Sequence, residues 1–144
     1  MRQGNAIALI SRIREKANNF IIGELEKEGI TGIAPSHGDI FTILFQTESI
    51  PMTELAARIH RTKPTVTVLV DKLVAKGFVI KEKVVTDNRV TLIKLTEAGL
   101  SLQPIIQRIS DKLNQIVYQG LTDEEALQLE RLLRVVNLNF EQDR

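Results

Sequence analysis

The 144-residue sequence contains no cysteine and no tryptophan, and aromatic residues make up only 4% of it. The absence of cysteine excludes disulfides, thiolate metal sites and cysteine-based redox sensing, and it fits a reducing cytosolic compartment. No run of about 18 apolar residues occurs, and residues 1–10 contain no apolar stretch of signal-peptide length. We therefore expect a cytoplasmic protein that has an aliphatic core and does not contact a membrane.

An excess of charge of one sign is also absent overall, because 19 basic residues against 18 acidic ones leave a formal net charge of +1. The distribution is nevertheless uneven. The segment from Arg58 to Lys94 holds nine basic and three acidic residues, a net charge of +6, and the rest of the chain carries −5. Such a basic segment is a candidate surface for the phosphates of a nucleic acid. A solvated surface without a partner is the alternative explanation.

Apolar spacing and chain breakers predict a mainly α-helical fold with one β-hairpin. Helices are expected over residues 6–28, 37–47, 54–59 and 63–76, and over two further segments that follow Thr96 and Thr122. Strands are expected over residues 78–83 and 90–95, with a turn at residues 86–88. The expected N-caps are Ser36, Thr53, Thr62, Thr96 and Thr122, the last in a capping box with Glu125. Because the terminal helices are strongly apolar, we expect them to pack against a second copy of the chain.

The segment Met52–Leu69 has the residue spacing of a helix-turn-helix. Ala56 is small, as the close crossing of two helices requires, and His60 stands where the chain must turn. A turn of this kind often needs a positive φ, which histidine tolerates better than most residues other than glycine. An ordinary helical hairpin is the alternative explanation of this spacing.

The second helix of this pair has a polar side that suits the DNA major groove, and Pro64 is tolerated in its first turn. The residues expected in the core are Val66, Leu69, Val70 and Leu73. The residues expected to face outward are Lys63, Thr65, Thr67, Val68 and Lys72. Threonine hydroxyls can bond base edges or phosphates, and a valine methyl can contact a thymine methyl. Simple exposure to solvent is the alternative for the two threonines.

The hairpin adds Lys81, Lys83 and Arg89 to the same basic segment. A basic residue just past a tight turn can enter a narrow minor groove, where the negative potential is strongest. Asp87 precedes Arg89 by two residues and is placed to hold its guanidinium in one orientation through a two-point pairing. An exposed ion pair of little energetic value is the alternative.

Together these segments resemble the MarR (multiple antibiotic resistance regulator) family of bacterial winged helix-turn-helix transcription factors. The resemblance runs through TELAARIHRTKPTVTVLVDKLVAKGFV, residues 53–79, and through DNRVTLIKLTEAG, residues 87–99. In the second stretch an Asp-x-Arg is followed by an apolar strand that ends Leu-Thr-x-x-Gly. The resemblance implies a homodimer on a pseudo-palindromic operator in double-stranded DNA, with recognition helices about one helical turn apart. It also implies that Arg89 enters the minor groove and that Asp87 positions it.

The resemblance assigns residues 36–96 to the winged helix-turn-helix region and residues 1–35 and 97–144 to dimerisation helices, within one continuous compact unit. The expected DNA-binding residues are Thr53, Arg61, Lys63, Pro64, Thr65, Thr67, Val68, Lys72, Lys81, Lys83, Asp87 and Arg89. Two positions depart from the family pattern. Lys81 stands where arginine is frequent, and Asn88 replaces a residue that is commonly basic, so fewer phosphate contacts are expected from the wing.

The expected function is transcriptional repression that a small-molecule effector can relieve, without catalytic residues, cofactor or metal. The sequence has no glycine-rich phosphate loop and no histidine paired with a nucleophile. Its two histidines, His37 and His60, lie apart, and His37 is expected to pack or cap a helix rather than bind a metal. An enzyme is one alternative, and a winged-helix interaction module that has lost DNA binding is the other. Replacing Arg89 should lower DNA affinity only if the protein is a DNA-binding regulator, so this change distinguishes the regulator from both alternatives.

Overall fold

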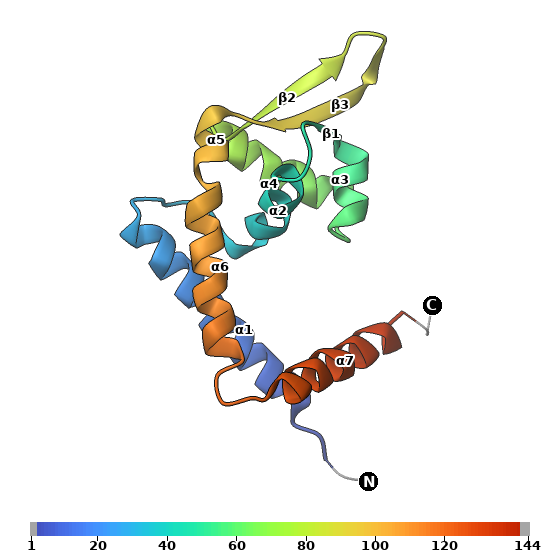
Figure 1. Ribbon diagram of the computed structural model, residues 1–144. Helices are drawn as coiled ribbons and strands as arrows, with labels where there is room; N and C mark the ends of the chain where they lie inside the picture. The colour runs from blue at the N-terminus through green and yellow to red at the C-terminus, as the bar shows by residue number, and fades with distance from the viewer. Residues whose placement is uncertain (1–2, 142–144) are drawn as a thin grey trace. The chain divides into compact units, whose positions relative to one another are not determined.

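The computed structural model describes residues 3–141 as helices joined to one small antiparallel sheet (Figure 1). The helices are α1 (Ala6–Lys27), the 3₁₀ helix η1 (Pro35–His37), α2 (Gly38–Leu44), α3 (Met52–Arg58), α4 (Lys63–Ala75), α5 (Glu97–Ser101), α6 (Gln103–Val117) and α7 (Asp123–Asn139). The strands are β1 (Ile50–Pro51), β2 (Val79–Val84) and β3 (Asp87–Leu95). This arrangement confirms the predicted mainly α-helical class with a β-hairpin. No helix in the described part of the chain is long and apolar enough to cross a membrane.

Contacts within the chain divide it into two compact units, of which the first ends at Ile109 and the second begins at Ser110. The second unit contains the end of α6 and all of α7. Tyr118 donates a hydrogen bond of 3.0 Å to Glu130 of α7, and this bond raises the pKa of Tyr118. No residue of α7 is buried within the chain. The hydrophobic core therefore lies in the first unit, which also contains the expected DNA-binding region.

The core of the first unit is largely aliphatic, as the scarcity of aromatic residues predicts. Phe41 of α2, Leu55 of α3 and Val70 of α4 are each fully buried. The ring of Phe41 lies against those of Phe45 and Phe78, with centroid separations of 5.7 and 6.4 Å. Burial of side chains of this size contributes about 1.5–3 kcal/mol each. This packing holds one side of α4 against the core, and the other side of α4 remains exposed.

The sheet has the strand order β1-β3-β2, with both pairs antiparallel. The expected turn at residues 86–88 is wrong, because the chain turns at Val85 and Thr86, and Asp87 already pairs with Val84 in the ladder. Asp87 and Asn88 are polar residues typical of a turn, but here they begin β3, where their side chains remain accessible to water. β1 was not predicted from the sequence, because two residues are too few to show a periodic pattern. Its proline is tolerated because β1 is an edge strand.

Two of the expected N-caps are wrong. Ser36 lies inside η1, and α2 begins at Gly38 without a side-chain cap. Thr53 is the second residue of α3, whose N-cap is Pro51. In both places a proline precedes the polar residue, and the helical conformation begins at that proline or directly after it. The other expected caps are confirmed, namely Thr62, Thr96 and Thr122 with its capping box to Glu125.

The long helix expected after Thr96 is interrupted at Leu102, which separates α5 from α6. The cause is Pro104, because proline has no N–H and its ring clashes with the carbonyl group four residues earlier. The N–H of Leu102 instead bonds the carbonyl oxygen of Gly99 at 3.2 Å. The chain therefore starts a new helix rather than continuing the first.

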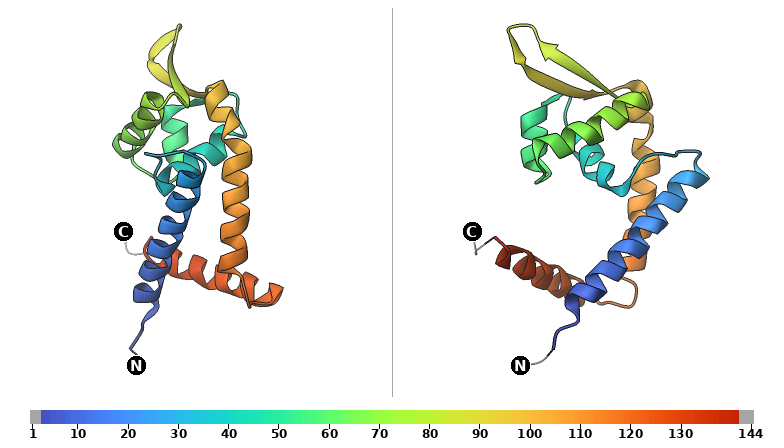
Figure 2. Two further views of the ribbon diagram at one scale, coloured as in Figure 1. Left: turned by 90° about the vertical axis from the view of Figure 1, so that its left-hand side faces the viewer. Right: turned by 180° about the vertical axis from the view of Figure 1, so that it is seen from behind.

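The hairpin is fastened at its base to α5, and both views in Figure 2 show it extending from the helices of the first unit. The backbone N–H of Thr96 bonds the carbonyl oxygen of Phe78 at 3.0 Å, and the Thr96 hydroxyl donates to the carbonyl oxygen of Gly77 at 2.6 Å. A Cβ atom on Gly99 would collide with the Phe78 carbonyl. The Leu-Thr-x-x-Gly pattern is therefore explained by this close approach of helix and strand.

Candidate nucleic-acid interface

Helices α3 and α4 form a helix-turn-helix whose turn depends on His60. Among the described residues other than glycine, only His60 has a positive φ, of 56°. Its N–H bonds the carbonyl oxygen of Ala57 at 3.2 Å, and the N–H of Arg61 bonds that of Ala56 at 3.1 Å. These two bonds satisfy the last carbonyl groups of α3 in the Schellman pattern. The positive φ predicted for His60 is confirmed.

The first turn of α4 leaves two threonines with different hydrogen-bonding capacity. Thr62 donates to the hydroxyl of Thr65 at 2.9 Å and accepts from its N–H at 3.4 Å. Because the Thr65 hydroxyl is the acceptor, its own hydrogen remains for a partner outside the helix. Thr67 instead donates to the carbonyl oxygen of Lys63 at 2.9 Å. Thr65 can therefore donate to an external group, whereas Thr67 can only accept from one.

The two sides of α4 differ as the sequence predicts. Val66, Val70 and Leu73 are buried, and Leu69 is half-buried. Val68 is 70% exposed although it is apolar. The polar or charged neighbours that are exposed with it on the helix are Lys63, Thr65 and Lys72, and Pro64 is exposed in the first turn. Thr67 is half-buried. This side of α4 therefore offers the apolar groups of Pro64 and Val68 among hydroxyl groups and cations.

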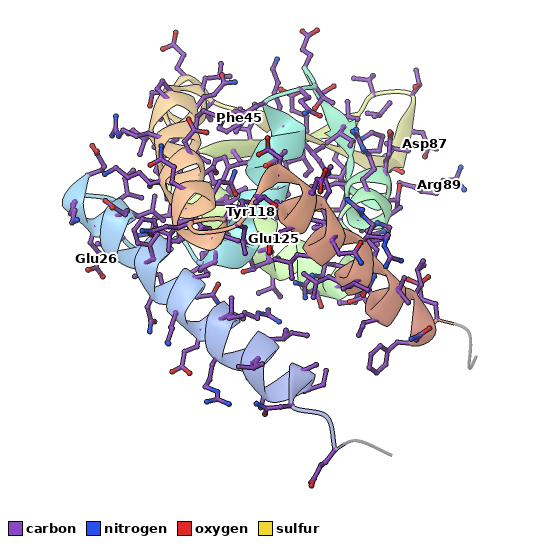
Figure 3. All side chains as sticks on the ribbon, turned by 60° about the horizontal axis from the view of Figure 1, so that its bottom comes forward. Glu26, Phe45, Asp87, Arg89, Tyr118 and Glu125 are labelled. Atoms are coloured by element: carbon purple, nitrogen blue, oxygen red, sulfur yellow. The ribbon has the colours of Figure 1, made fainter. Side chains whose placement is uncertain are left out.

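Arg89 and Asp87 form the pairing expected on the hairpin, and Figure 3 shows them together on β3. Arg89 Nε lies 3.0 Å from Asp87 Oδ1, and Arg89 Nη2 lies 3.2 Å from Oδ2. The backbone N–H of Arg89 also bonds Oδ1, at 3.1 Å. These hydrogen bonds lower the pKa of Asp87 and raise the pKa of Arg89. The Arg89 side chain is 87% exposed, so the guanidinium is oriented yet accessible.

The two lysines of β2 are also held by neighbours. Lys81 Nζ lies 2.6 Å from Asp71 Oδ1, so this ion pair joins β2 to α4. Lys83 Nζ donates to the hydroxyl of Thr91 at 2.9 Å, and the two residues are directly opposite in the ladder. Each ammonium uses one of its three N–H donors in these contacts, and the others remain for a ligand.

A hollow of about 280 Å³ lies between the start of α4, the start of α3 and the hairpin. Six of the expected DNA-binding residues line it, namely Thr53, Lys63, Thr67, Lys81, Lys83 and Arg89. The remaining six are not part of its lining, namely Arg61, Pro64, Thr65, Val68, Lys72 and Asp87. Four of the lining residues are basic and none is acidic. A hollow of this composition is suited to the phosphate oxygens of a nucleic-acid backbone.

Sequence reasoning did not identify four other residues of this lining, namely Pro51, Met52, Val90 and Thr91. Thr91 was detectable in principle, because it stands two residues after Arg89 in a strand and so shares its face. Pro51 and Met52 had no such signal. They reach the hollow because β1 pairs with β3, so that Ile50 lies opposite Ile93, 43 residues further along the chain, and Pro51 lies opposite Leu92.

His37 supports α4 from the core side. It is 1% exposed; its Nδ1 accepts from the N–H of Ala34 at 2.9 Å, and its Nε2 lies 3.2 Å from the carbonyl oxygen of Leu69 on α4. Burial lowers the pKa of His37, and the charge of Lys72 acts in the same direction. His37 is thus a packing residue, as expected. Within residues 3–141 no group of three or more histidine, aspartate or glutamate side chains could hold a metal ion.

Comparisons with known proteins agree with this geometry. The model of the MarR family matches residues 33–91. The chain is 32% identical over 81 residues to the uncharacterized HTH-type transcriptional regulator YdgJ of Bacillus subtilis, covering 56% of this chain but only 49% of YdgJ. It is 25% identical to the HTH-type transcriptional regulator MhqR of the same organism, covering 93% of this chain and 90% of MhqR. These relatives are named as regulators rather than enzymes.

Among solved structures, a mutant of MarR from E. coli in complex with operator DNA has a TM-score of 0.78 to this chain at 25% identity. The superposition covers 94% of this chain and 99% of that one. The predicted winged helix-turn-helix fold is thereby confirmed. The chain therefore resembles the MarR family, whose model matches its winged helix-turn-helix region and whose solved structures share its fold over nearly the whole length.

Proposed function

We propose that the protein is a cytoplasmic, homodimeric repressor that binds a pseudo-palindromic operator in double-stranded DNA. The observation that carries the proposal is the basic hollow between α4 and the hairpin, with Arg89 exposed at its edge and oriented by Asp87. Helix α4 lies in the major groove, and Arg89 enters the neighbouring minor groove. The MarR–operator complex supports this arrangement because its fold matches nearly the whole chain.

Base edges in the major groove are read by the exposed side of α4. Thr65 has a hydroxyl hydrogen to donate to a base, and Val68 exposes its methyl groups to a thymine methyl. Thr67 accepts, and Pro64 brings the first turn of the helix close to the DNA. These contacts provide sequence preference.

Phosphate contacts provide most of the affinity and no sequence preference. They are made by residues on α3, on α4 and its preceding turn, and on β2, namely Thr53, Arg61, Lys63, Lys72, Lys81 and Lys83. Lys81 and Lys83 are held in place by Asp71 and Thr91, so that they lose little conformational freedom on binding.

Dimerisation is assigned to residues 1–35 and 97–144. The support for this assignment is apolar surface that the chain leaves exposed, including Ile7 at 64% and Ile13 at 58% on α1 and Leu127 at 67% on α7. Exposed apolar side chains repeated along a helix mark interaction sites. A second copy is the occupant, because two recognition helices related by a two-fold axis match a pseudo-palindromic operator.

Repression follows if the occupied operator overlaps the start of transcription, and a small-molecule effector that favours a DNA-free state relieves it. Such a ligand acts only through a difference in affinity between the two states of the dimer. Effector relief is therefore measured as a rise in the dissociation constant for operator DNA when the ligand is present.

Selection from a randomised pool of duplexes tests the proposal. Purified protein is mixed with the pool, bound duplexes are recovered, and their dissociation constants are measured at two salt concentrations. We expect an inverted-repeat sequence whose affinity falls steeply with salt, because each phosphate contact releases counterions. Recovery of no preferred sequence, together with no affinity for random duplex at low salt, would contradict the proposal. That result favours an interaction module that has lost DNA binding.

A further inference from the structure

The tip of the hairpin carries a residue that its local environment disfavours. Val85 is 101% exposed, more than any other large apolar residue in the described part of the chain. It forms the two-residue loop with Thr86, between Val84 and Asp87, which pair in the ladder. Two-residue hairpin loops favour glycine, asparagine or aspartate with positive φ, and β-branched residues are poorly suited to them.

The loop forms in spite of this composition. Neither Val85 nor Thr86 has a positive φ, and the ladder shifts its register between Lys83 and Val84 to accommodate the turn. Hairpin stability does not account for a valine at this place, and neither does burial. Departures from local rules of this kind occur where a residue serves a contact with a partner.

The charges next to Val85 identify the chemistry of that partner. The guanidinium of Arg89 is held by Asp87, the first residue after the loop, so it lies close to the tip. Lys83 precedes the loop by two residues. An apolar group between a guanidinium and an ammonium matches the minor groove of DNA, where deoxyribose forms the walls and phosphates form the rims. It does not match an apolar protein surface, which would leave both cations without partners.

We infer that Val85 is a specificity-determining residue of the wing, whose isopropyl group packs against the deoxyribose walls of the minor groove that Arg89 enters. The contact requires walls that are close together. A narrow A·T-rich groove supplies them, whereas the guanine amino group and the wider groove of G·C pairs do not. This inference rests on the proposed DNA-binding function. It assigns to the hairpin tip a preference for A·T base pairs at positions that α4 does not contact.

The test compares Val85→Thr and Val85→Ile with wild type on the duplex selected by the wild-type protein. Val85→Thr keeps the shape and replaces one methyl by a hydroxyl, so we expect a loss of affinity of about three- to tenfold. Val85→Ile keeps an apolar side chain and should bind within about twofold of wild type. The slope of affinity against salt should be the same for all three proteins, because no charge changes. Val74→Thr, the same substitution on the exposed end of α4, is the matched control and should bind like wild type.

A second duplex tests specificity. Footprints of wild type and Arg89→Ala identify the base pairs at which the wing lies, and A·T pairs there are changed to G·C. Wild type should lose affinity on this change, and Val85→Thr should lose at least threefold less. Equal affinity of Val85→Thr and wild type on both duplexes would overturn the inference while DNA binding stands, as would a change in the salt slope. A wild-type protein that selects no duplex at all would instead overturn the proposed function, and the inference with it.

Discussion

Lys81 on β2 and Asp71 on α4 are joined by an ion pair of 2.6 Å, so the wing is linked directly to the helix proposed to read DNA. Both side chains are partly exposed, at 37% and 52%, and an exposed pair of this kind contributes little to stability. Its role is geometric. It joins the two elements proposed to contact DNA, and it places a carboxylate beside a hollow whose charged lining residues are all basic.

Replacement of Asp71 by asparagine tests both the link between β2 and α4 and the effect of the Asp71 charge on DNA affinity. Asp71→Asn removes a negative charge and releases Lys81, so affinity for random duplex should rise about two- to fivefold. The ratio of operator affinity to random affinity should fall, because the wing is no longer held against α4. The free energy of unfolding should change by less than about 0.5 kcal/mol. Fluorescence titration with both duplexes measures the ratio. Asp39→Asn, the same charge change on α2, is the control, and an identical ratio for both variants would show that the ion pair has no role in positioning.

The buried His37 makes stability depend on pH. Its folded-state pKa lies below the unfolded value, because burial disfavours the charged imidazole. The unfolded chain therefore binds a proton near pH 6.5 that the folded chain does not, and the free energy of unfolding falls as the pH drops below about 6.5. It levels off below the folded pKa. Urea unfolding at about pH 7.5 and about pH 5.5 measures this change.

Two variants assign the change to His37. His37→Gln cannot gain a proton, so the difference in free energy of unfolding between the two pH values should shrink, although the variant is less stable at both. His60→Asn removes the other histidine and keeps a residue that tolerates a positive φ, so it is the matched control. A wild-type difference that persists in His37→Gln would show that other groups cause it.

The positive φ of His60 predicts opposite effects for two substitutions. His60→Gly should raise the free energy of unfolding by up to about 1 kcal/mol, because it removes the Cβ contact that disfavours this conformation. His60→Val should lower it by about 1–2 kcal/mol, because a β-branched side chain makes that contact worse. Chemical denaturation measures both. Ala75→Gly, where glycine only loosens an ordinary helical position, should be destabilising, and a destabilised His60→Gly would contradict the strain argument.

The exposed apolar residues of α7 predict that charge on this helix separates the dimer. Leu132 is 46% and Val136 36% exposed, and no residue of α7 is buried, so replacing both by aspartate leaves the hydrophobic core of the chain intact. We expect the double variant to remain helical by circular dichroism and to sediment as a monomer. Gln128→Asp adds a charge at an exposed polar position of the same helix and should leave the dimer intact. A double variant that sediments like wild type would place the dimer contact elsewhere.

Local signals in the sequence were sufficient for much of the fold. The boundaries of α1 and α4 agree with prediction to within one residue, because apolar spacing and the breakers Gly29 and Gly77 act within a few residues of the helix. The turn at His60 follows from the same local chemistry. The interruption at Leu102 was also local, and Pro104 was the signal that the apolar pattern concealed.

The candidate site needed information that no local pattern carries. Lys81 was expected to contact DNA, and its pairing with Asp71 depends on how β2 packs beside α4. The participation of Met52 in the hollow depends on β1, which is too short to have a pattern. The pairing of Arg89 with Asp87 was predicted because the two residues are only two positions apart in the sequence, so their side chains lie close together wherever the rest of the chain packs.

A titration of operator duplex with Arg89→Ala tests whether Arg89 enters the minor groove. Arg131→Ala removes the same charge from α7 and serves as the control. We expect Arg89→Ala to lose about 1–3 kcal/mol of binding free energy, about five- to 150-fold in the dissociation constant, and its salt slope to fall by about one, while Arg131→Ala binds like wild type. Equal dissociation constants for wild type, Arg89→Ala and Arg131→Ala at both low and physiological salt would contradict it.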